Sequence, residues 1–180
     1  MAKMIDNKPS WKGEGKVWES LSANLPGDNV VYNQREVNGR EYDFCVMAEN
    51  LGLVIIEVKG WDPDKIDVRG VDNIIVDGYD APQTSPKKQA RAYRFAILNK
   101  IVEKYNASPL VLDMVCYPFI SQEQYVRTKL DIVSEPEYTI FKEDIEDGKK
   151  LNEKIQHLFT LNKFIPHADF SYDLMVRIRK

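Results

Sequence analysis

Residues 52–60 read GLVIIEVKG, and the expected architecture of the chain is built outward from this run. Leu53 to Lys59 forms a predicted strand that is apolar on both faces until Glu57 and Lys59 appear near its end. A strand of this kind is normally central in a sheet that is covered on both sides. Because side chains two residues apart on a strand point to the same face, Glu57 and Lys59 are expected to lie together.

The preceding strand, predicted over residues 40–48, supplies a third charged group. A hairpin register centred on Asn50 places Asp43 directly opposite Glu57, with Cβ atoms about 4.5–5.5 Å apart. A two-residue loop would instead place Asp43 and Glu57 out of line and on opposite faces of the sheet, so the register is itself a prediction. Two carboxylates held this close repel each other unless they share a proton or a cation.

The remaining elements follow from periodicity and from turn residues. Asn38-Gly39 is typical of a tight turn between strands, and Ser85 followed by Pro86 is typical of a helix start. The predicted order is a helix over 13–24, strands over 29–37, 40–48 and 53–59, short strands and loops over 60–85, a helix over 86–105, a strand over 110–119, a helix over 122–129, a strand over 138–141 and a helix over 144–159. This order predicts an α/β fold with a mixed central sheet flanked by helices.

Composition excludes several classes of protein. The chain has 180 residues and a formal net charge of −3, which argues against a nucleic-acid binder that is basic overall. Its best apolar run, over residues 51–56, is much shorter than the roughly 18–20 residues that span a membrane, so no membrane association is expected. The first residues also lack the apolar core of a secretory signal peptide.

The cysteines and histidines indicate the cellular compartment and argue against a zinc site. Cys45 and Cys116 both lie in apolar strands, and two buried thiols in a reducing cytoplasm is the interpretation favoured over a disulfide. Together with His157 and His167 they form no zinc-ligand spacing. A cytoplasmic protein without structural zinc is therefore expected.

Positive charge is concentrated in the helix predicted over residues 86–105. That helix carries six basic residues against one acid, Glu103. The four nearest its start are candidates for contacts with phosphates, and the alternative is a solvated helix face. Trp61, just after the central strand, is a candidate for stacking on a base, and the alternative is packing against residues 60–85. The predicted nucleic-acid ligands are thus Lys87, Lys88, Arg91, Arg94 and Trp61.

The charged group at the end of the hairpin favours a divalent cation. Mg²⁺ (or Mn²⁺) prefers a few carboxylate oxygens and keeps several waters, which leaves room for a substrate phosphate. Lys59 would then stabilise developing negative charge. The alternative interpretation is a plain salt bridge at a strand end, because a Glu-x-Lys triplet alone is common.

These residues closely resemble the nuclease-related domain (NERD) family of the PD-(D/E)XK nuclease superfamily. The resemblance rests on Glu41-Tyr42-Asp43-Phe44, on GLVIIEVKG over residues 52–60, on Gly13-Glu14, and on PKKQARAY over residues 86–93, and it covers roughly residues 13–145. It implies a restriction-endonuclease-like core with the order αβββαβ, which agrees with the order of elements given above.

The resemblance also implies roles for individual residues. Asp43 and Glu57 would ligate the metal together with the backbone carbonyl of Val58, and Lys59 would be the catalytic lysine. Glu14 would complete the acidic site as a metal ligand and catalytic residue, against the alternative of a helix-terminal carboxylate favoured by the dipole. Gln89 would orient substrate or a water. The expected catalytic set is Asp43, Glu57, Lys59, Gln89 and Glu14.

The expected domain organisation has three parts. Residues 1–12 are expected to form a flexible arm, residues 13–145 the nuclease-like domain, and residues 146–180 a helical extension or a linker to a further domain. In this family, similar motifs often precede a UvrD/Rep-type helicase, so the resemblance implies an attached or partner helicase and a longer native chain. The 180 residues contain no phosphate-binding loop of the G-x-x-x-x-G-K-[ST] type, so no ATPase activity is assigned to them.

Three functions compete at this point. The first is a Mg²⁺-dependent nuclease that hydrolyses DNA phosphodiester bonds. The second is a catalytically silent module with a nuclease-like fold that binds nucleic acid or a partner. The third is a plain interaction domain, in which the charged trio and the basic helix are coincidental. The presence of Asp43, Glu57 and Lys59 together favours the first.

Overall fold

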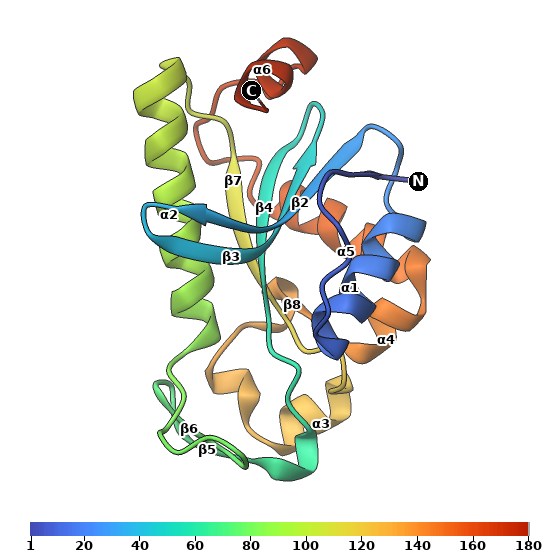
Figure 1. Cartoon of the computed structure of the whole chain (residues 1–180), viewed down its shortest axis with the longest axis vertical. Coiled ribbons are helices and arrows are strands. Elements are labelled where there is room, and N and C mark those ends of the chain that lie inside the picture. Colours follow the sequence, from blue (N-terminus) through green and yellow to red (C-terminus); the bar gives the residue numbers. More distant parts are fainter. Residues whose placement is uncertain (180) are drawn as a thin grey trace.

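Strand β4 (Gly52–Val58) lies in the middle of a six-stranded sheet in the computed structural model, which describes residues 1–179 (Figure 1). The strand order is β1-β2-β3-β4-β7-β8. β4 runs antiparallel to β3 and parallel to β7, so the sheet is mixed as expected. The other strands of the sheet are β1 (Lys3–Met4), β2 (Asn29–Val37), β3 (Arg40–Ala48), β7 (Val111–Cys116) and β8 (Thr139–Ile140).

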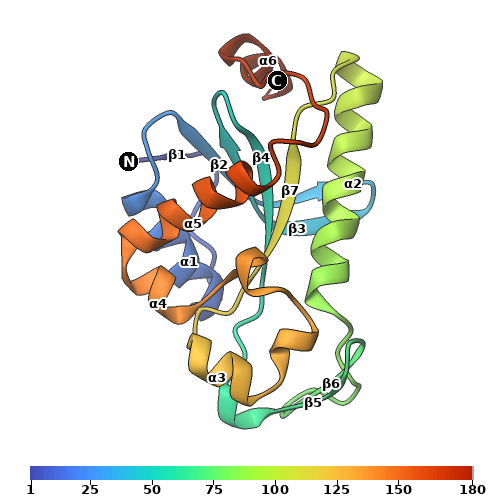
Figure 2. The ribbon, with the colours of Figure 1, turned by 180° about the vertical axis from the view of Figure 1, so that it is seen from behind.

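Helices cover both faces of this sheet, which explains why β4 is apolar on both sides (Figures 1 and 2). One face packs against α1 (Lys12–Asn24), α4 (Lys142–Glu146) and α5 (Gly148–Leu161). The other face packs against α2 (Pro86–Tyr105) and α6 (Tyr172–Ile178). The core order α1-β2-β3-β4-α2-β7 is the expected αβββαβ order, and the predicted fold class is confirmed.

The predicted hairpin register is also confirmed. Ala48 pairs with Gly52 across a three-residue turn, and the ladder continues to the pair Phe44–Ile56. Asp43 and Glu57 are next in line on their two strands. Asn50 adopts a left-handed backbone in the turn, at φ +67°, which asparagine tolerates better than most residues.

A third hydrophobic cluster lies at one end of the sheet. It is formed by the excursion between β4 and α2, which contains the two-stranded sheet of β5 (Ile66–Gly70) and β6 (Asn73–Val76), and by α3 (Gln122–Arg127) with the loops that follow it. Short 3-10 turns over Pro63–Lys65, Leu130–Ile132 and Pro136–Tyr138 complete this region. The excursion therefore has a core of its own beside the end of β4.

Both ends of the chain are more integrated than the sequence indicates. Residues 1–12 do not form a loose arm: β1 pairs in parallel with β2, and Asp6 accepts hydrogen bonds from the Asn33 N–H and from Arg35. At the other end, α5 and α6 each bury apolar side chains against a different face of the sheet. The helix predicted over 144–159 is two helices, because Asp147 ends α4 and its side chain caps the start of α5.

Cys45 and Cys116 are buried free thiols, and they belong to core clusters on opposite faces of the sheet. Burial raises the pKa of the Cys45 thiol to about 12. None of the helices in the described part of the chain is long and apolar enough to cross a bilayer.

Gly52 is a position that only glycine fits. Its φ is +148°, and a Cβ added there would lie 2.2 Å from the Leu110 carbonyl oxygen on the neighbouring chain segment. We therefore expect Gly52→Ala to lower the free energy of unfolding by about 3 kcal/mol, measured by urea denaturation. Gly27→Ala is the control, because its added Cβ meets only an ordinary contact at 3.6 Å. Equal stability of the two variants would contradict the packing described here.

Candidate active site

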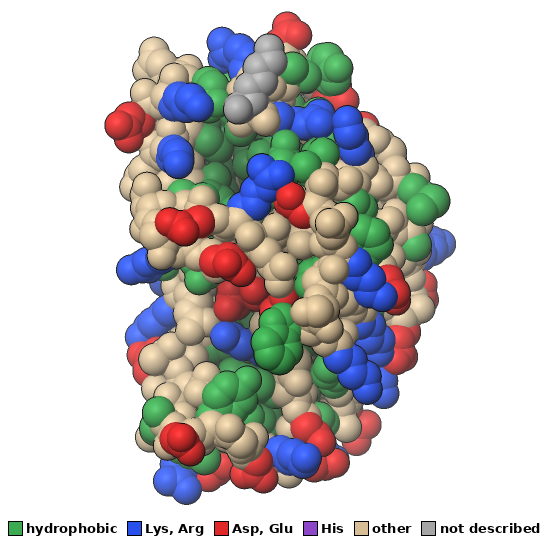
Figure 3. Space-filling view, viewed as in Figure 1, with side chains coloured by type: hydrophobic (Ala, Val, Ile, Leu, Met, Phe, Trp, Pro, Cys, Tyr) green, Lys and Arg blue, Asp and Glu red, His purple; other side chains and the backbone are tan. Residues whose placement is uncertain are grey.

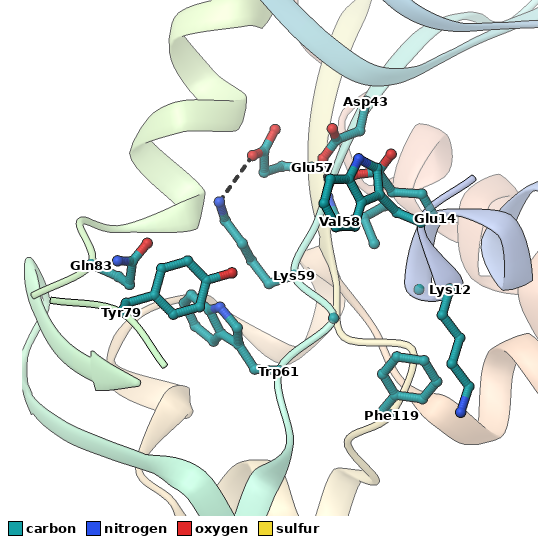
Figure 4. Close-up of a pocket in the computed structure, with 13 residues that line it drawn as sticks. Lys12, Glu14, Asp43, Glu57, Val58, Lys59, Trp61, Tyr79, Gln83 and Phe119 are labelled. Atoms are coloured by element: carbon teal, nitrogen blue, oxygen red, sulfur yellow. Dashed lines mark hydrogen bonds and ion pairs between the residues drawn. The ribbon is translucent and has the colours of Figure 1, made fainter. Parts of the chain in front are cut away.

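A cavity of about 510 Å³ opens where β3 and β4 separate (Figure 4). The β3–β4 ladder ends at Phe44–Ile56, and just beyond it the Asp43 Oδ2 accepts a hydrogen bond from the Val58 N–H at 2.7 Å. The Asp43 side chain thus replaces the ladder at the point where the strands part. The charged residues that line the cavity are Lys12, Glu14, Asp43, Glu57 and Lys59.

Asp43 and Glu57 are held in this cavity at an electrostatic cost. Glu57 is only 6% exposed, and its Oε2 is buried without a hydrogen-bond partner. Burial raises the pKa of both carboxyls, and the neighbouring Glu57 carboxylate raises that of Asp43 further. The fold therefore holds two mutually repelling acids next to each other.

Lys59 partly offsets this negative charge. Its Nζ lies 3.2 Å from Glu57 Oε1, as the dashed line in Figure 4 shows. The Lys59 backbone N–H donates to the Cys116 carbonyl at 2.9 Å, which anchors the residue just past the end of β4. The structure thus brings together the predicted trio of Asp43, Glu57 and Lys59.

Glu14 reaches the same cavity from the first turn of α1. The helix can approach β4 closely because Gly13 has no side chain: a Cβ added there would lie 3.2 Å from the Gly60 Cα. Glu14 is half-buried, and burial raises its pKa. Glu14 is therefore the fourth predicted residue that the structure places in the cavity.

Gln34 is a residue that sequence reasoning missed. It lies on β2 between the pairs Asn33–Phe44 and Arg35–Tyr42, hence opposite Asp43, and its φ is +53°. This left-handed backbone is uncommon for a residue in a strand. Its Nε2 donates to Glu14 Oε2 at 2.9 Å, so Gln34 holds the third acid of the cavity in place. The sequence of β2 contains no signal that would predict a left-handed backbone at Gln34.

The donor set fits a divalent cation. The unpartnered Oε2 of Glu57, the nearby Asp43 carboxylate and the adjacent Val58 backbone are the oxygen-bearing groups that Mg²⁺ prefers. Within residues 1–179, no three His, Cys, Asp or Glu side chains form a ready-made metal cluster. Mg²⁺ does not require one, because it is commonly held by one or two carboxylates and retains waters.

Gln89 does not line the cavity. It lies in the first turn of α2, where its Nε2 donates to Thr84 Oγ1 at 3.1 Å and its Oε1 is buried without a partner. The glutamine that lines the cavity is Gln83, in the loop before α2. Gln89 therefore makes no direct contact with the Asp43 and Glu57 carboxylates, and its role in orienting substrate or a water stays a prediction.

The basic start of α2 is used largely for internal ion pairs. Lys87 is 7% exposed, and its Nζ lies 2.5 Å from Oδ1 of the buried Asp113. Arg94 approaches the other oxygen of Asp113 at 3.6 Å, and Lys88 pairs with Asp72. The prediction that Lys87 contacts nucleic acid is wrong, because its charge is needed to neutralise Asp113 beneath the helix. Arg91 is exposed on the surface of α2.

Trp61 is not a free stacking platform. Its side chain is 4% exposed and packs with Tyr117, at 6.0 Å between ring centroids, in the cluster that contains β5 and β6. The predicted base-stacking role is therefore wrong, and the alternative of packing against the excursion is confirmed. The exposed aromatic side chains at the cavity belong instead to Trp11 and Tyr79.

Comparison with known proteins gives the family of the chain. The nuclease-related domain (NERD) family matches residues 9–118, and the chain belongs to that family. The crystal structure of a repair endonuclease from Pyrococcus abyssi aligns with 75% of this chain at 14% identity and a TM-score of 0.38. The chain spans about half of that structure's length, with 48% of it covered. No curated protein matches the chain.

Replacing Lys87 tests whether its role is structural. Lys87→Met leaves the Asp113 carboxylate buried with only the more distant Arg94, so we expect the free energy of unfolding to fall by about 3 kcal/mol. Arg91→Met, on the exposed surface of the same helix, is expected to change it by less than about 0.5 kcal/mol. Urea denaturation of both variants checks this, and similar stabilities would restore Lys87 as a binding residue.

The carboxylate repulsion is testable without any substrate. In the presence of a chelator, Asp43→Asn is expected to raise the free energy of unfolding by about 1 kcal/mol, because it removes a partly buried acid beside the buried Glu57. The amide oxygen of the new side chain can still accept from the Val58 N–H. Asp28→Asn, in an exposed turn, controls for the change in net charge. A loss of stability in the Asp43 variant would show that its charge is favourably paired.

Proposed function

We propose that this chain is a Mg²⁺- or Mn²⁺-dependent nuclease that hydrolyses phosphodiester bonds in DNA. The observation that supports it most strongly is the convergence of Asp43, Glu57 and Lys59 in one cavity, with Glu57 Oε2 left without a partner. Membership of the nuclease-related domain family is a second support.

In this proposal, Asp43, Glu57 and the Val58 carbonyl hold the cation. When bound, the cation supplies a water of lowered pKa and neutralises charge on the phosphodiester. The chain's own contribution is to orient the carboxylates: the Val58 N–H donates to Asp43 at 2.7 Å, and this hydrogen bond opposes the rise that burial causes in the Asp43 pKa. Glu14, fixed by Gln34, adds negative charge on the α1 side of the cavity.

Lys59 provides the positive charge that phosphoryl chemistry needs. Its Nζ lies within the cavity and is paired only with Glu57 among the described residues. An ammonium group here can donate to a non-bridging phosphate oxygen, where negative charge develops in the transition state. Its proximity to Trp61, 6.0 Å from Nζ to ring centroid, limits the directions in which the side chain can turn.

A silent nucleic-acid-binding or partner-docking module is the second candidate. One observation favours it: Lys59 already pairs with Glu57, at 3.2 Å from Nζ to Oε1. In either case, an attached or partner helicase belongs to the proposal. Its support is the likeness of GLVIIEVKGW and PKKQA to the helicase-associated members of the family.

Cleavage of labelled DNA decides between the two candidates. We expect the wild-type chain to cut single- or double-stranded DNA in Mg²⁺ or Mn²⁺ and not in a chelator. Glu57→Ala and Lys59→Ala are each expected to reduce the rate at least about 100-fold. Asp67→Ala, on the exposed β5–β6 hairpin, serves as the matched acidic control and should cut normally.

The opposite result would identify the silent module. Folded wild-type chain that does not cut, yet binds DNA equally well with and without the Glu57 carboxylate, would contradict the nuclease proposal. Cleavage that survives in the Lys59→Ala variant would keep the nuclease and remove Lys59 from its chemistry.

A further inference from the structure

Two exposed aromatic rings stand at the mouth of the carboxylate cavity. Trp11 is 72% exposed and Tyr79 is 57% exposed, and both line the cavity that contains Asp43 and Glu57. Trp11 precedes α1, whereas Tyr79 follows β6, so segments far apart in the sequence supply the two rings. The other two tryptophans contrast with Trp11, because Trp18 packs against the core and Trp61 is buried.

The exposure of Trp11 has no structural explanation within the described residues. Trp11 occupies the N-cap position of α1, but its indole N–H is a donor only and cannot accept from the helix N–H groups. An indole ring has a large apolar surface, and leaving it in water forgoes the stabilisation that burial gives. Rings left exposed beside a polar cavity are typical of sites that receive another planar group.

Positive charge continues from this cavity along α1 and not along α2. Lys12 is exposed, lines the cavity, and lies with its Nζ 5.7 Å from the centre of the Phe119 ring. Within residues 1–179 it has no ion-pair partner. A neighbouring hollow shares Trp11 and Lys12 and adds Lys8 and Lys16, although these two lysines pair with Glu19 and Glu146.

A third hollow extends the basic surface on the other side. It shares Lys12 and Phe119 with the cavity and adds the exposed Lys142 together with one acid, Asp62. Figure 3 shows Lys and Arg side chains gathered over α1, beside the acidic side chains in the central hollow, and Figure 4 shows Lys12 beyond Phe119 on the side of the cavity away from Tyr79. The two smaller hollows both adjoin the carboxylate cavity at Lys12, and we call the three together the track.

We propose that this track binds an unpaired strand of nucleic acid, with Trp11 and Tyr79 stacking on its bases and Lys12 contacting its backbone. The inference rests on the proposed function, since it names the substrate class of the same cavity. Bases in a duplex are stacked on one another and expose only their edges, so rings at the level of the cavity can stack only on bases that are unpaired. Stacking of this kind tolerates any base sequence.

A protein segment is a less favourable occupant of the same surface. A peptide would gain from the rings, but it would not need the row of lysines beside a cavity built from carboxylates. A polyanion whose bases are planar uses both features at once: the lysines attract its phosphates and the rings stack on its bases. The two carboxylates then lie beside one phosphate of the strand, the arrangement that cleavage requires.

Binding in a chelator tests the proposal without cleavage. We expect fluorescence anisotropy to show that a labelled oligodeoxythymidylate of about 20 nucleotides binds at least tenfold more tightly than a blunt duplex of equal length. Trp11→Ala and Tyr79→Ala should each weaken binding of the single strand about tenfold, and Trp11→Phe should restore most of it. An oligouridylate of equal length distinguishes DNA from RNA as the source of the strand.

One control and one further variant separate stacking from the loss of an unrelated aromatic ring and from charge. Tyr172→Ala removes an exposed tyrosine, 58% exposed on α6, and should leave the affinity unchanged. Lys12→Ala should lower affinity. It should also reduce the slope of log affinity against log salt concentration by about one, the contribution of one phosphate contact. Because both rings are exposed, the variants are expected to remain folded, which circular dichroism checks.

The outcomes are distinguishable from those of the nuclease proposal. Equal affinity for single strand and duplex, or an unchanged affinity in Trp11→Ala and Tyr79→Ala, would overturn the strand-binding site even if Mg²⁺ supports cleavage. Loss of affinity in those variants supports the site even if Mg²⁺ supports no cleavage. A wild-type chain that binds neither nucleic acid would also overturn it, and would direct attention to a protein partner at Trp11.

Discussion

The candidate site depends on the register of one hairpin. The three-residue turn between Ala48 and Gly52 aligns β3 with β4 so that Asp43 comes level with Glu57 at the point where the strands separate. A shift of one residue would turn one of these side chains to the opposite face of the sheet. Gly52, at the end of this turn, also lets β4 lie close to the segment before β7, because the Leu110 carbonyl leaves no space for a side chain there. The geometry of the turn therefore determines the chemistry at the other end of the hairpin.

The site is electrostatically unfavourable for the fold alone. The half-buried Asp43 lies beside the buried Glu57, a third acid is held nearby by Gln34 in a left-handed backbone, and one oxygen of Glu57 has no partner. Local conflicts of this kind concentrate at functional sites, where the surrounding structure supports them. Elsewhere the fold neutralises its buried charges: Asp113 is paired with Lys87 beneath α2. The contrast between the two places indicates that the excess negative charge of the cavity serves a ligand.

The sequence was sufficient for the β3–β4 hairpin and the trio, because both follow from short-range patterns: an apolar strand, a turn length and side-chain alternation. It was not sufficient for β1, which lies in the segment expected to be a flexible arm. It was insufficient where the outcome depends on contacts distant in the chain. The sequence predicts that Lys87 lies on the exposed surface of its helix. Only the packing of α2 over β7 shows that it neutralises Asp113. The exposure of Trp11 and the burial of Trp61 are likewise set by tertiary packing, since both residues are tryptophans beside polar segments.

The most direct test of this account is a calorimetric titration of the chain with Mn²⁺ in the absence of nucleic acid. The account predicts one ion per chain, with affinity lowered at least about tenfold by Asp43→Asn and by Glu57→Gln, and unchanged by Asp67→Asn on the exposed β5–β6 hairpin. Binding that is absent from the wild type, or equally strong in all three variants, would contradict the claim that the paired carboxylates form a cation site.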